Sequence, residues 1–533
     1  MNNKIKKILC IALVAVMLLG TFTGCGNKDE SKNGIIVSAG TSLFDDSLDP
    51  IKGSMSYGYP FVCEALMMAN PDSEYVGCLA ESWDMVDATT YRFKLHQGIK
   101  FSNGTDFNAD DVVFTYETVK NNQALNSNVD LSSLESVTKL NDYEVEFKLT
   151  KPYSPFFDVT AMLQIVPSDS YDSTLFDTMP VGTGAYKVVQ YDTNQQIILE
   201  ANENYHGTAP DIKRVTLVYM DQSAAFAAAK SGDLDIVMVS VSYADEKIEG
   251  MKYVEFDTMD VRNLSLVTQP VRTIKHPVTG KDITVGNDVT CDVNVRKAIA
   301  IGIDRQTIIN NALNGVGRAT ENYTENLTWT SKTGYEDNRK EEAKRILEAA
   351  GWIDTDGDGI REKDGLRCAI DVIAASGDDD RYRLLSALGE EAKELGIEIT
   401  AKTGTWGEIE QLQYTNGVIW GWGQFSPTVI QSLYSSDRFL VGTYDNVGGY
   451  DNPEVDAYIN AAITAETQEE ATKNWIAAQD VANAEYPYIY IVNIRHGFFI
   501  SDRIDISMDT QIPHPHGHGA PIINNMADWT YVK

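Results

Sequence analysis

The chain has 533 residues, a formal net charge of −33 at pH 7 and 43% hydrophobic residues. A domain usually has about 100–200 residues, so this length predicts two or three domains, and the apolar content is sufficient for folded cores rather than disorder. A surface this acidic repels phosphate backbones, which argues against nucleic acid as a partner.

The N-terminal segment has the pattern of an export signal. Three lysines among the first seven residues precede an apolar run over residues 8–22. This run is too short to cross a hydrocarbon core of about 30 Å, but it fits a signal peptide. No later stretch of the sequence has the roughly 18 consecutive apolar residues that a membrane-spanning helix needs.

The end of this run resembles a bacterial lipobox, in which a small residue precedes a cysteine. Gly24 and Cys25 match, whereas Phe22 stands where leucine is usual. The resemblance implies that residues 1–24 are a lipoprotein signal peptide and that Cys25 is acylated. Residues 25–34 would then be a flexible tether on the outer face of the cell membrane. A secretory peptide with an incidental cysteine is the alternative.

The next segments alternate between the two-residue period of a strand and the 3.6-residue period of a helix. From Tyr91 to Phe101, the apolar residues Tyr91, Phe93 and Leu95 first occupy every second position, which predicts a half-buried strand. Residues 108–122 predict a helix with a polar cap at its start. Residues 142–149 predict a second alternating strand.

The rest of the chain repeats this alternation. We expect a hairpin over 186–202, a strand over 214–220, a helix and strand over 221–239, one long amphipathic helix over 293–315, and helices within 339–352, 384–395, 454–465 and 469–485. Strands that alternate with helices over long stretches predict an α/β or mixed α+β class.

Motifs of catalysis are absent from the sequence. It contains no G-x-S-x-G, H-E-x-x-H or C-x-x-C pattern and only seven histidines, so we expect binding rather than an enzyme, with no cofactor. Residues 354–365 begin like a calcium loop, but Gly365 stands where a glutamate should be, which favours a turn. Besides Cys25, the mature chain keeps four cysteines: Cys63, Cys78, Cys291 and Cys368. The sequence is compatible both with disulfides between them and with isolated thiols.

Four longer segments carry a resemblance to a known family. They are "LAESWDMVDATTYRFKLHQGIKFSNGTDFNADDVVFTYE" from Leu79, "MPVGTGAYKVVQY" from Met179, "CDVNVRKAIAIGIDRQTIINNALNGVGRA" from Cys291, and "AKRILEAAGWIDTDGDGIREKDG" from Ala343. In this order they resemble the extracellular solute-binding proteins of family 5, the peptide/nickel-type binding components of ABC importers. The similarity covers essentially residues 35–500.

The resemblance implies a class II periplasmic-binding-protein fold with two lobes, a hinge and an extra subdomain. Lobe one would comprise residues 35–75, 165–275 and 490–533, the extra subdomain residues 76–164, and lobe two residues 276–489. The implied partners are an ABC permease with its ATPase, and we expect a monomer that is held on the extracytoplasmic face of the membrane through Cys25.

Peptide binders of this family carry a W-x-x-D-x-x-D-P-like stretch whose first aspartate pairs with the peptide α-ammonium. The matching stretch here, residues 419–427, has Gln424 at that position and Ser426 in place of the second aspartate. A neutral amide cannot offset a buried ammonium charge. We expect the apolar walls of the cleft to come from Trp420, Trp422 and Phe425. We expect the polar anchors of the ligand to be Gln424, Arg495 and His496. A surface salt bridge is the alternative for Arg495.

Two further groups are candidates. Ser56, Tyr57 and Tyr59 could line the cleft, or the tyrosines could be packing residues. His514, His516 and His518 alternate in a Pro/Gly loop, a spacing that can place three imidazoles on one metal ion or simply form a structural loop.

Three hypotheses follow from these observations. The leading one is a lipid-anchored protein that captures small peptides for an ABC importer. The second is a nickel or metal-chelate binding protein of the same family, and the third is an extracellular sensor or chaperone-like interaction protein.

The lipobox resemblance predicts the mature N-terminus. Mass spectrometry of protein extracted from membranes is expected to find a chain that begins at acylated Cys25, and the Cys25→Ser variant should lose the anchor. An unmodified N-terminus elsewhere would show instead that the leader is a plain secretory peptide.

Overall fold

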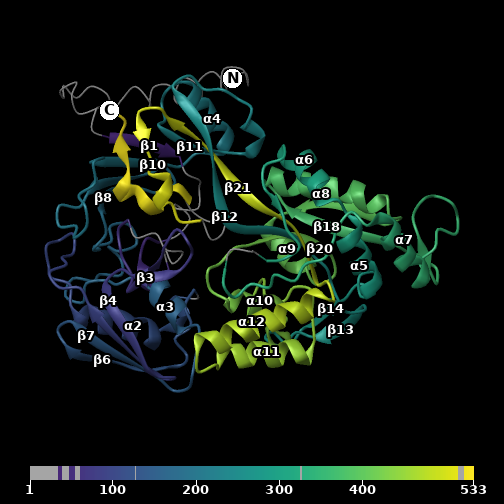
Figure 1. The fold of residues 1–533 in the computed structure, drawn as a ribbon, viewed down its shortest axis with the longest axis horizontal. Helices are drawn as coiled ribbons and strands as arrows, with labels where there is room; N and C mark the ends of the chain where they lie inside the picture. The colour runs from purple at the N-terminus through teal and green to yellow at the C-terminus, as the bar shows by residue number, and fades with distance from the viewer. Residues whose placement is uncertain (1–33, 39–46, 54–60, 127, 324–326, 514–520) are drawn as a thin grey trace, which may run out of the picture.

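The computed structural model describes residues 34–38, 47–53, 61–126, 128–323, 327–513 and 521–533. A mixed sheet of eleven strands runs through this described part of the chain (Figure 1). Its strands, in order across the sheet, are β19 (Glu398–Gly404), β18 (Ala369–Ala375), β20 (Gly417–Trp422), β12 (Met251–Ser265), β21 (Tyr488–Ser501), β11 (Ile236–Val239), β1 (Gly34–Ser38), β10 (Arg214–Val218), β9 (Gln196–Ala201) and β8 (Tyr186–Asp192). A short strand, β15 (Arg318–Ala319), pairs with β21 off this path.

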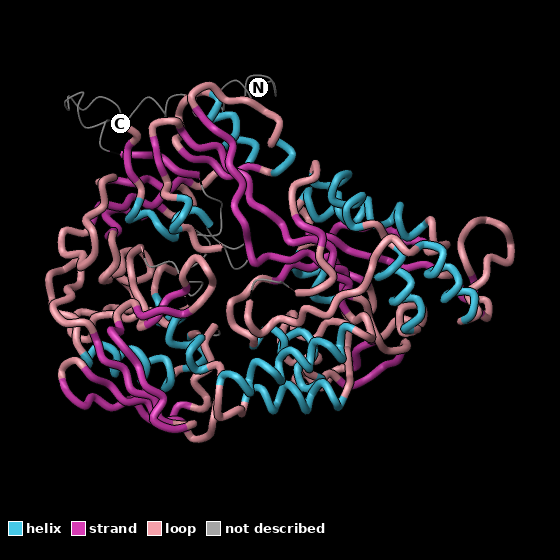
Figure 2. The backbone as a smooth tube through the Cα atoms, viewed as in Figure 1, coloured by secondary structure: helices cyan, strands magenta, loops and turns pink. Residues whose placement is uncertain are grey.

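Two long strands join the two halves of this sheet. β12 has 15 residues and β21 has 14, and they pair antiparallel along most of their length. The last residues of β21 also pair with β11, whereas the last residues of β12 pair with β20. We call the strands β8–β11 with β1 the first half and β18–β20 the second half; β12 and β21 cross between them in Figures 1 and 2.

The pairing of β12 with β21 is irregular at the middle of the crossing. Asp257 pairs with Arg495, and the ladder resumes only at Val261, which pairs with Asn493. The hydroxyl of Thr258 donates to the carbonyl of Ile494 at 2.7 Å, so a side chain replaces ladder hydrogen bonds at this point.

Helices accompany both halves of the sheet. They are α4 (Gln222–Lys230) in the first half, and α5 (Val293–Gly302), α6 (Arg305–Leu313), α7 (Lys340–Ala349), α8 (Asp379–Lys393), α9 (Trp406–Leu412), α10 (Thr428–Tyr434), α11 (Pro453–Ile463) and α12 (Gln468–Asn483) in the second. Side chains cap many of their starts: Asp221 accepts from the Ala224 amide at 2.9 Å, and Thr405 forms a reciprocal capping box with Glu408.

The single helix expected over residues 293–315 is wrong, because two helices occupy this segment. α5 ends at Gly302, and Asp304 accepts from the amide of Thr307 at 2.9 Å to start α6. Gly302 packs so closely that an added Cβ would lie 2.7 Å from the Leu395 side chain. The apolar period continues through the break because both helices pack on the same core.

A smaller unit is formed by residues that come before most strands of the large sheet in the sequence. Its antiparallel sheet has the order β4 (Ala80–Asp87), β5 (Thr90–Leu95), β7 (Glu144–Leu149) and β6 (Leu134–Asn141), and α2 (Ala109–Asn121) packs against it. The expected alternation is confirmed, because Tyr91, Phe93 and Leu95 are buried while the residues between them are exposed. This unit also contains the hairpin of β2 (Met67–Ala69) and β3 (Tyr75–Gly77), and the short helix α3 (Phe156–Met162).

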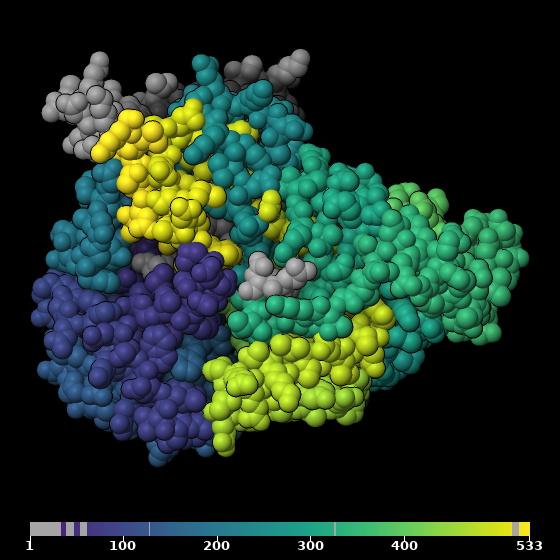
Figure 3. Space-filling model, in the orientation of Figure 1, coloured from purple at the N-terminus to yellow at the C-terminus, as the bar shows by residue number. Residues whose placement is uncertain are grey.

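The smaller unit touches the second half of the large sheet through Ser154. Its amide donates to the carbonyl of Ile463 at 2.8 Å and its hydroxyl to the carbonyl of Ala462 at 2.7 Å. Gln468 returns a hydrogen bond to the Ser154 carbonyl at 2.9 Å. Figure 3 shows the two surfaces in contact at this place, which lies away from the β12–β21 crossing.

Short hairpins lie outside the two sheets. They pair β13 (Arg272–Lys275) with β14 (Asp282–Val285), β16 (Glu362–Lys363) with β17 (Leu366–Arg367), and β22 (Ile504–Asp505) with β23 (Thr530–Tyr531). Cys63, Cys78, Cys291 and Cys368 are free thiols. Within the described ranges, no helix combines the length and apolar character that crossing a membrane requires.

Arg305 ties α6 to the crossing strand β21. Its side chain has no exposed surface, and its guanidinium donates to the carbonyls of Thr320, Tyr490 and Ala300 at 2.8–3.1 Å. These buried acceptors would lose their partner if the guanidinium were removed, which costs more than the bonds themselves contribute.

We therefore expect Arg305→Met to lower the free energy of unfolding by about 3 kcal/mol, measured by urea denaturation. Arg339→Met is the matched control, since its side chain is 44% exposed and forms surface ion pairs, and it should change stability by less than about 1 kcal/mol. Equal effects in the two variants would contradict a structural role for the Arg305 network.

Candidate functional site

An aromatic wall forms where β20 ends. Trp420 and Trp422 lie on the same side of this strand because one residue separates them. The Trp420 ring is stacked with Trp406 at a centroid distance of 5.8 Å and an interplanar angle of 17°, and it lies 5.3 Å from Tyr444 and 6.3 Å from Trp422. We refer to Trp406, Trp420, Trp422 and Tyr444 as the aromatic wall.

The chain that follows β20 is fixed by residues from a distant segment. The amide of Gln424 donates to the Tyr323 hydroxyl at 2.7 Å, and the carbonyl of Phe425 accepts from the Trp329 indole at 2.9 Å. The structure therefore brings together four of the residues expected to contact a ligand: Trp420 and Trp422 belong to the wall, and Gln424 and Phe425 follow it in the chain.

Two indole groups of the wall have no hydrogen-bond acceptor among the described residues. They are the Nε1 atoms of Trp420 and Trp422, both of which are buried, and the Trp420 side chain is only 4% exposed. An indole N–H can only donate, and leaving it buried without an acceptor costs about 1–3 kcal/mol. A carbonyl or carboxylate oxygen would remove that cost only if it reached these two atoms, which the protein covers in this structure.

The sequence did not reveal the supporting aromatic residues. Tyr323, Trp329, Trp406 and Tyr444 come from other segments than residues 419–427, and none belongs to a recognisable motif. The one available signal was that Trp406 closely follows the strand pattern of residues 398–404. β18 lies between β19 and β20 in the sheet, so strand pairing does not explain the contact of Trp406 with Trp420, and the sequence pattern could not predict it.

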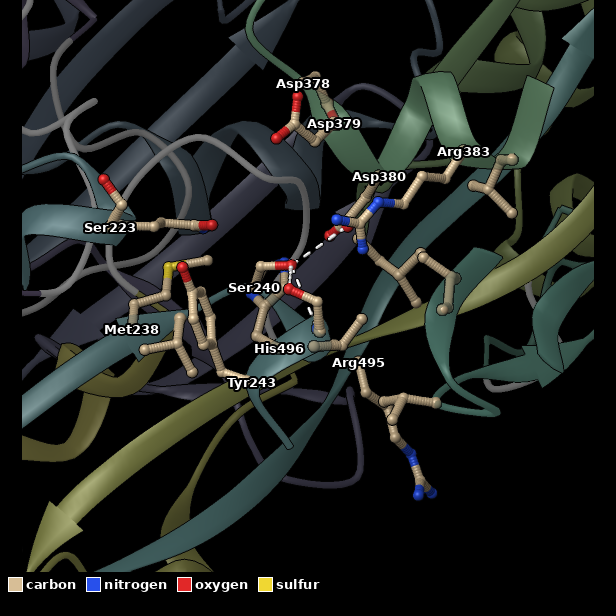
Figure 4. A pocket seen from close by; sticks show the side chains of 18 of the residues that line it. Ser223, Met238, Ser240, Tyr243, Asp378, Asp379, Asp380, Arg383, Arg495 and His496 are labelled. Carbon is tan, nitrogen blue, oxygen red and sulfur yellow. Dashed lines mark hydrogen bonds between the residues drawn. The ribbon is translucent and has the colours of Figure 1, made fainter. Parts of the chain in front are cut away.

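A concave region lies between the two halves of the sheet, next to the crossing strands. A cavity of about 570 Å³ is bounded by Met238 to Tyr243 from the first half, by Asp378 to Asp380 at the start of α8, and by Arg262 and His496 from the crossing strands. In Figure 4, Ser240 and His496 lie together near the centre of the view, with Asp380 next to them. The Ser240 hydroxyl donates to Asp380 at 3.2 Å and so bridges the two halves. Burial, reinforced by Asp378, raises the pKa of Asp380.

Arg495 and His496 are neighbours in β21 but have different environments. The Arg495 guanidinium forms ion pairs with Asp257 at 2.9 Å and Glu255 at 3.4 Å, is 46% exposed, and points away from the cavity in Figure 4. These contacts favour the salt-bridge alternative for Arg495. His496 is 6% exposed and lines the cavity.

Several expected site residues lie outside the described residues. They are Cys25, Ser56, Tyr57, Tyr59, His514, His516 and His518. Within the described part, one group could bring three metal ligands together: Asp354, Asp356 and Glu362. Oxygens of Asp354 and Glu362 already accept backbone N–H groups from their own loop, as the acidic turn expected from the sequence requires.

The chain matches a sequence model described as "Bacterial extracellular solute-binding proteins, family 5 Middle" over residues 74–439. It is 28% identical to Protein XP55 of Streptomyces lividans over 89% of this chain and 86% of that protein. It is 27% identical to the oligopeptide-binding protein AppA of Bacillus subtilis over 78% of this chain and 77% of that protein.

A solved structure shares the fold. NikZ of Campylobacter jejuni in complex with Ni(L-His) superposes with a TM-score of 0.76 at 22% identity, over 94% of this chain and 99% of that one. The expected mixed α/β binding-protein fold is thereby confirmed, and members of the matched family are solute-binding proteins rather than enzymes. The chain belongs to the bacterial extracellular solute-binding proteins of family 5.

Proposed function

We propose that this protein captures small peptides between two lobes and delivers them to an ABC permease. The aromatic wall is the observation that carries this proposal. It combines apolar ring surface with two indole donors that have no acceptor among the described residues. A peptide offers carbonyl acceptors at regular spacing together with apolar side chains, so it complements both features.

The fold supplies a mechanism of capture. The proposed lobes correspond to the two halves of the large sheet, with the smaller unit as the extra subdomain. β12 and β21 would act as the hinge, since their ladder is interrupted between Asp257 and Val261. Rotation about such a short irregular segment can close one lobe over a ligand without breaking either core.

The cellular setting belongs to the same proposal. A lipid anchor at Cys25 would hold the mature chain at the outer membrane surface, where the ligand is transferred to the permease and its ATPase. The relative AppA of Bacillus subtilis is named as an oligopeptide-binding protein, which supports peptides as the ligand class.

Isothermal titration calorimetry with a library of di- to pentapeptides tests the proposal directly. We expect saturable binding, and Trp422→Phe should weaken it about fivefold, because one hydrogen bond contributes about 1 kcal/mol. Trp83→Phe is the matched control, since Trp83 packs in the smaller unit, and it should leave affinity unchanged. Absence of heat with every peptide would refute the peptide proposal.

A nickel chelate is the second candidate, motivated by the spacing of His514, His516 and His518 and by the Ni(L-His) complex of NikZ. Ni²⁺ would be titrated with and without free histidine into the wild type and the variant with all three residues changed to alanine. We expect equal affinities in both proteins, as the peptide proposal requires. A loss of nickel binding confined to the variant would favour the metal-chelate function instead.

A further inference from the structure

The smaller unit is tied to the first half of the large sheet. The amide of Ser102 donates to the carbonyl of Gly182, which lies shortly before β8, at 2.8 Å. The carboxylate of Glu64, which precedes the β2–β3 hairpin, is hydrogen-bonded at 2.9 Å to His206, which follows β9. Because of these bonds, we expect the smaller unit to move with the first half when the two halves change their angle.

The smaller unit meets the second half at the turn between α11 and α12. The amide and hydroxyl of Ser154 donate to the carbonyls of Ile463 and Ala462, and Gln468 donates to the Ser154 carbonyl, at 2.7–2.9 Å. Ser154 is 5% exposed, and Ile463 packs against the cores of both bodies. Hydrogen bonds of this kind contribute little net free energy, because water takes their place when the surfaces separate. The contact can therefore part without breaking either core.

This contact lies on the face of the crossing strands that carries the aromatic wall. Val261 of β12 and Trp420 of the wall belong to the same core as Ile463. Arg262, the next residue of β12, points to the opposite face and lines the cavity described above. The ladder interruption in the β12–β21 crossing lies away from the contact, so a rotation there that parts the contact opens the side of the wall.

We propose that the contact of Ser154 with Ile463 and Gln468 is a latch, which parts to admit a ligand to the aromatic wall and forms again over the bound ligand. The inference rests on the proposed capture of peptides between the lobes, and it adds the place at which the cleft opens. In the empty protein the latch opens and closes. A ligand that contacts both lobes favours the closed form and keeps the latch shut.

The alternative is a permanent fastening between the smaller unit and the second half. The amide of Ser154 separates the two explanations, because its acceptor, the Ile463 carbonyl, belongs to the second half. This amide exchanges its hydrogen with solvent only when the contact parts. The amide of Phe156, two residues further on, donates to Tyr153 of its own unit at 3.1 Å and is the internal control.

Hydrogen–deuterium exchange at single-residue resolution tests the latch in the full mature chain. It would be measured on the empty protein and on protein saturated with the tightest-binding member of the di- to pentapeptide library. We expect binding to slow exchange at Ser154 by at least about tenfold and to leave Phe156 within about twofold. Equal protection of Ser154 in the empty and the loaded protein would show a permanent fastening and overturn the proposal.

Ser154→Ala weakens the latch, because it removes the hydroxyl bond and leaves the backbone amide in place. We expect the dissociation rate of each bound peptide to rise about threefold, whatever its sequence, since the latch holds the lobes and not the ligand. Ser132→Ala, at an exposed serine of the same unit, should leave the rate unchanged. An unchanged rate in Ser154→Ala, or a rise confined to some peptides, would contradict the latch.

The empty protein keeps the test independent of the ligand. In the Ser154→Ala variant without peptide, the amide of residue 154 should exchange about threefold faster than in the wild type, with Phe156 unchanged. If no member of the library binds, the peptide function fails, and this comparison still decides whether the contact opens. Unchanged exchange at residue 154, or an equal rise at Phe156, would overturn the latch.

Discussion

The antiparallel pairing of β12 with β21 is the constraint on which the rest of the structure depends. These two strands belong to both halves of the large sheet, so the backbone hydrogen bonds of one half continue into the other. The ladder is interrupted around Thr258, where a hydroxyl replaces a backbone donor. A pair of strands with a local interruption resists separation of the halves but permits a change in their angle.

The positions of the aromatic wall and the cavity follow from this crossing. The wall stands at the end of β20, which pairs with β12 just beyond the interruption. The cavity lies where β11 and α8 face each other across the same strands. A change of angle between the halves therefore alters the surroundings of both regions. Two neighbouring residues of β21 border the cavity in different ways: Arg495 is 46% exposed and forms ion pairs with Asp257 and Glu255, whereas His496 is buried.

The electrostatics of the contact surfaces are unusual for a chain with so much negative charge. Most carboxylates are exposed or paired, so their solvation costs little. Asp158 is the reverse: it is buried, its carboxylate accepts from the Tyr75 hydroxyl, and burial raises its pKa to about 7. Asp49 and Asp111 are likewise buried and have a raised pKa, so a buried carboxylate of this kind does not by itself mark a binding site in this protein.

Much of this protein was determined by the sequence alone. The alternation at Tyr91, Phe93 and Leu95 predicted the strand and its buried face, since burial follows a local period of two. The family motifs and the absence of catalytic motifs were likewise visible in the sequence. The predicted helix over 293–315 failed because the period cannot show that Gly302 packs tightly on Leu395.

The tertiary structure alone decided which distant residues meet. Tyr75 and Asp158 are 83 residues apart and Asp257 and Arg495 are 238 apart, yet the side chains of each pair are hydrogen-bonded. Propensity and periodicity act over a few residues, whereas these contacts depend on strand order and on the packing of whole units. The sequence thus determined which chemical groups are available and which faces they occupy, and the three-dimensional packing determined which of them meet, as Trp406, Trp420 and Tyr444 do at the end of β20.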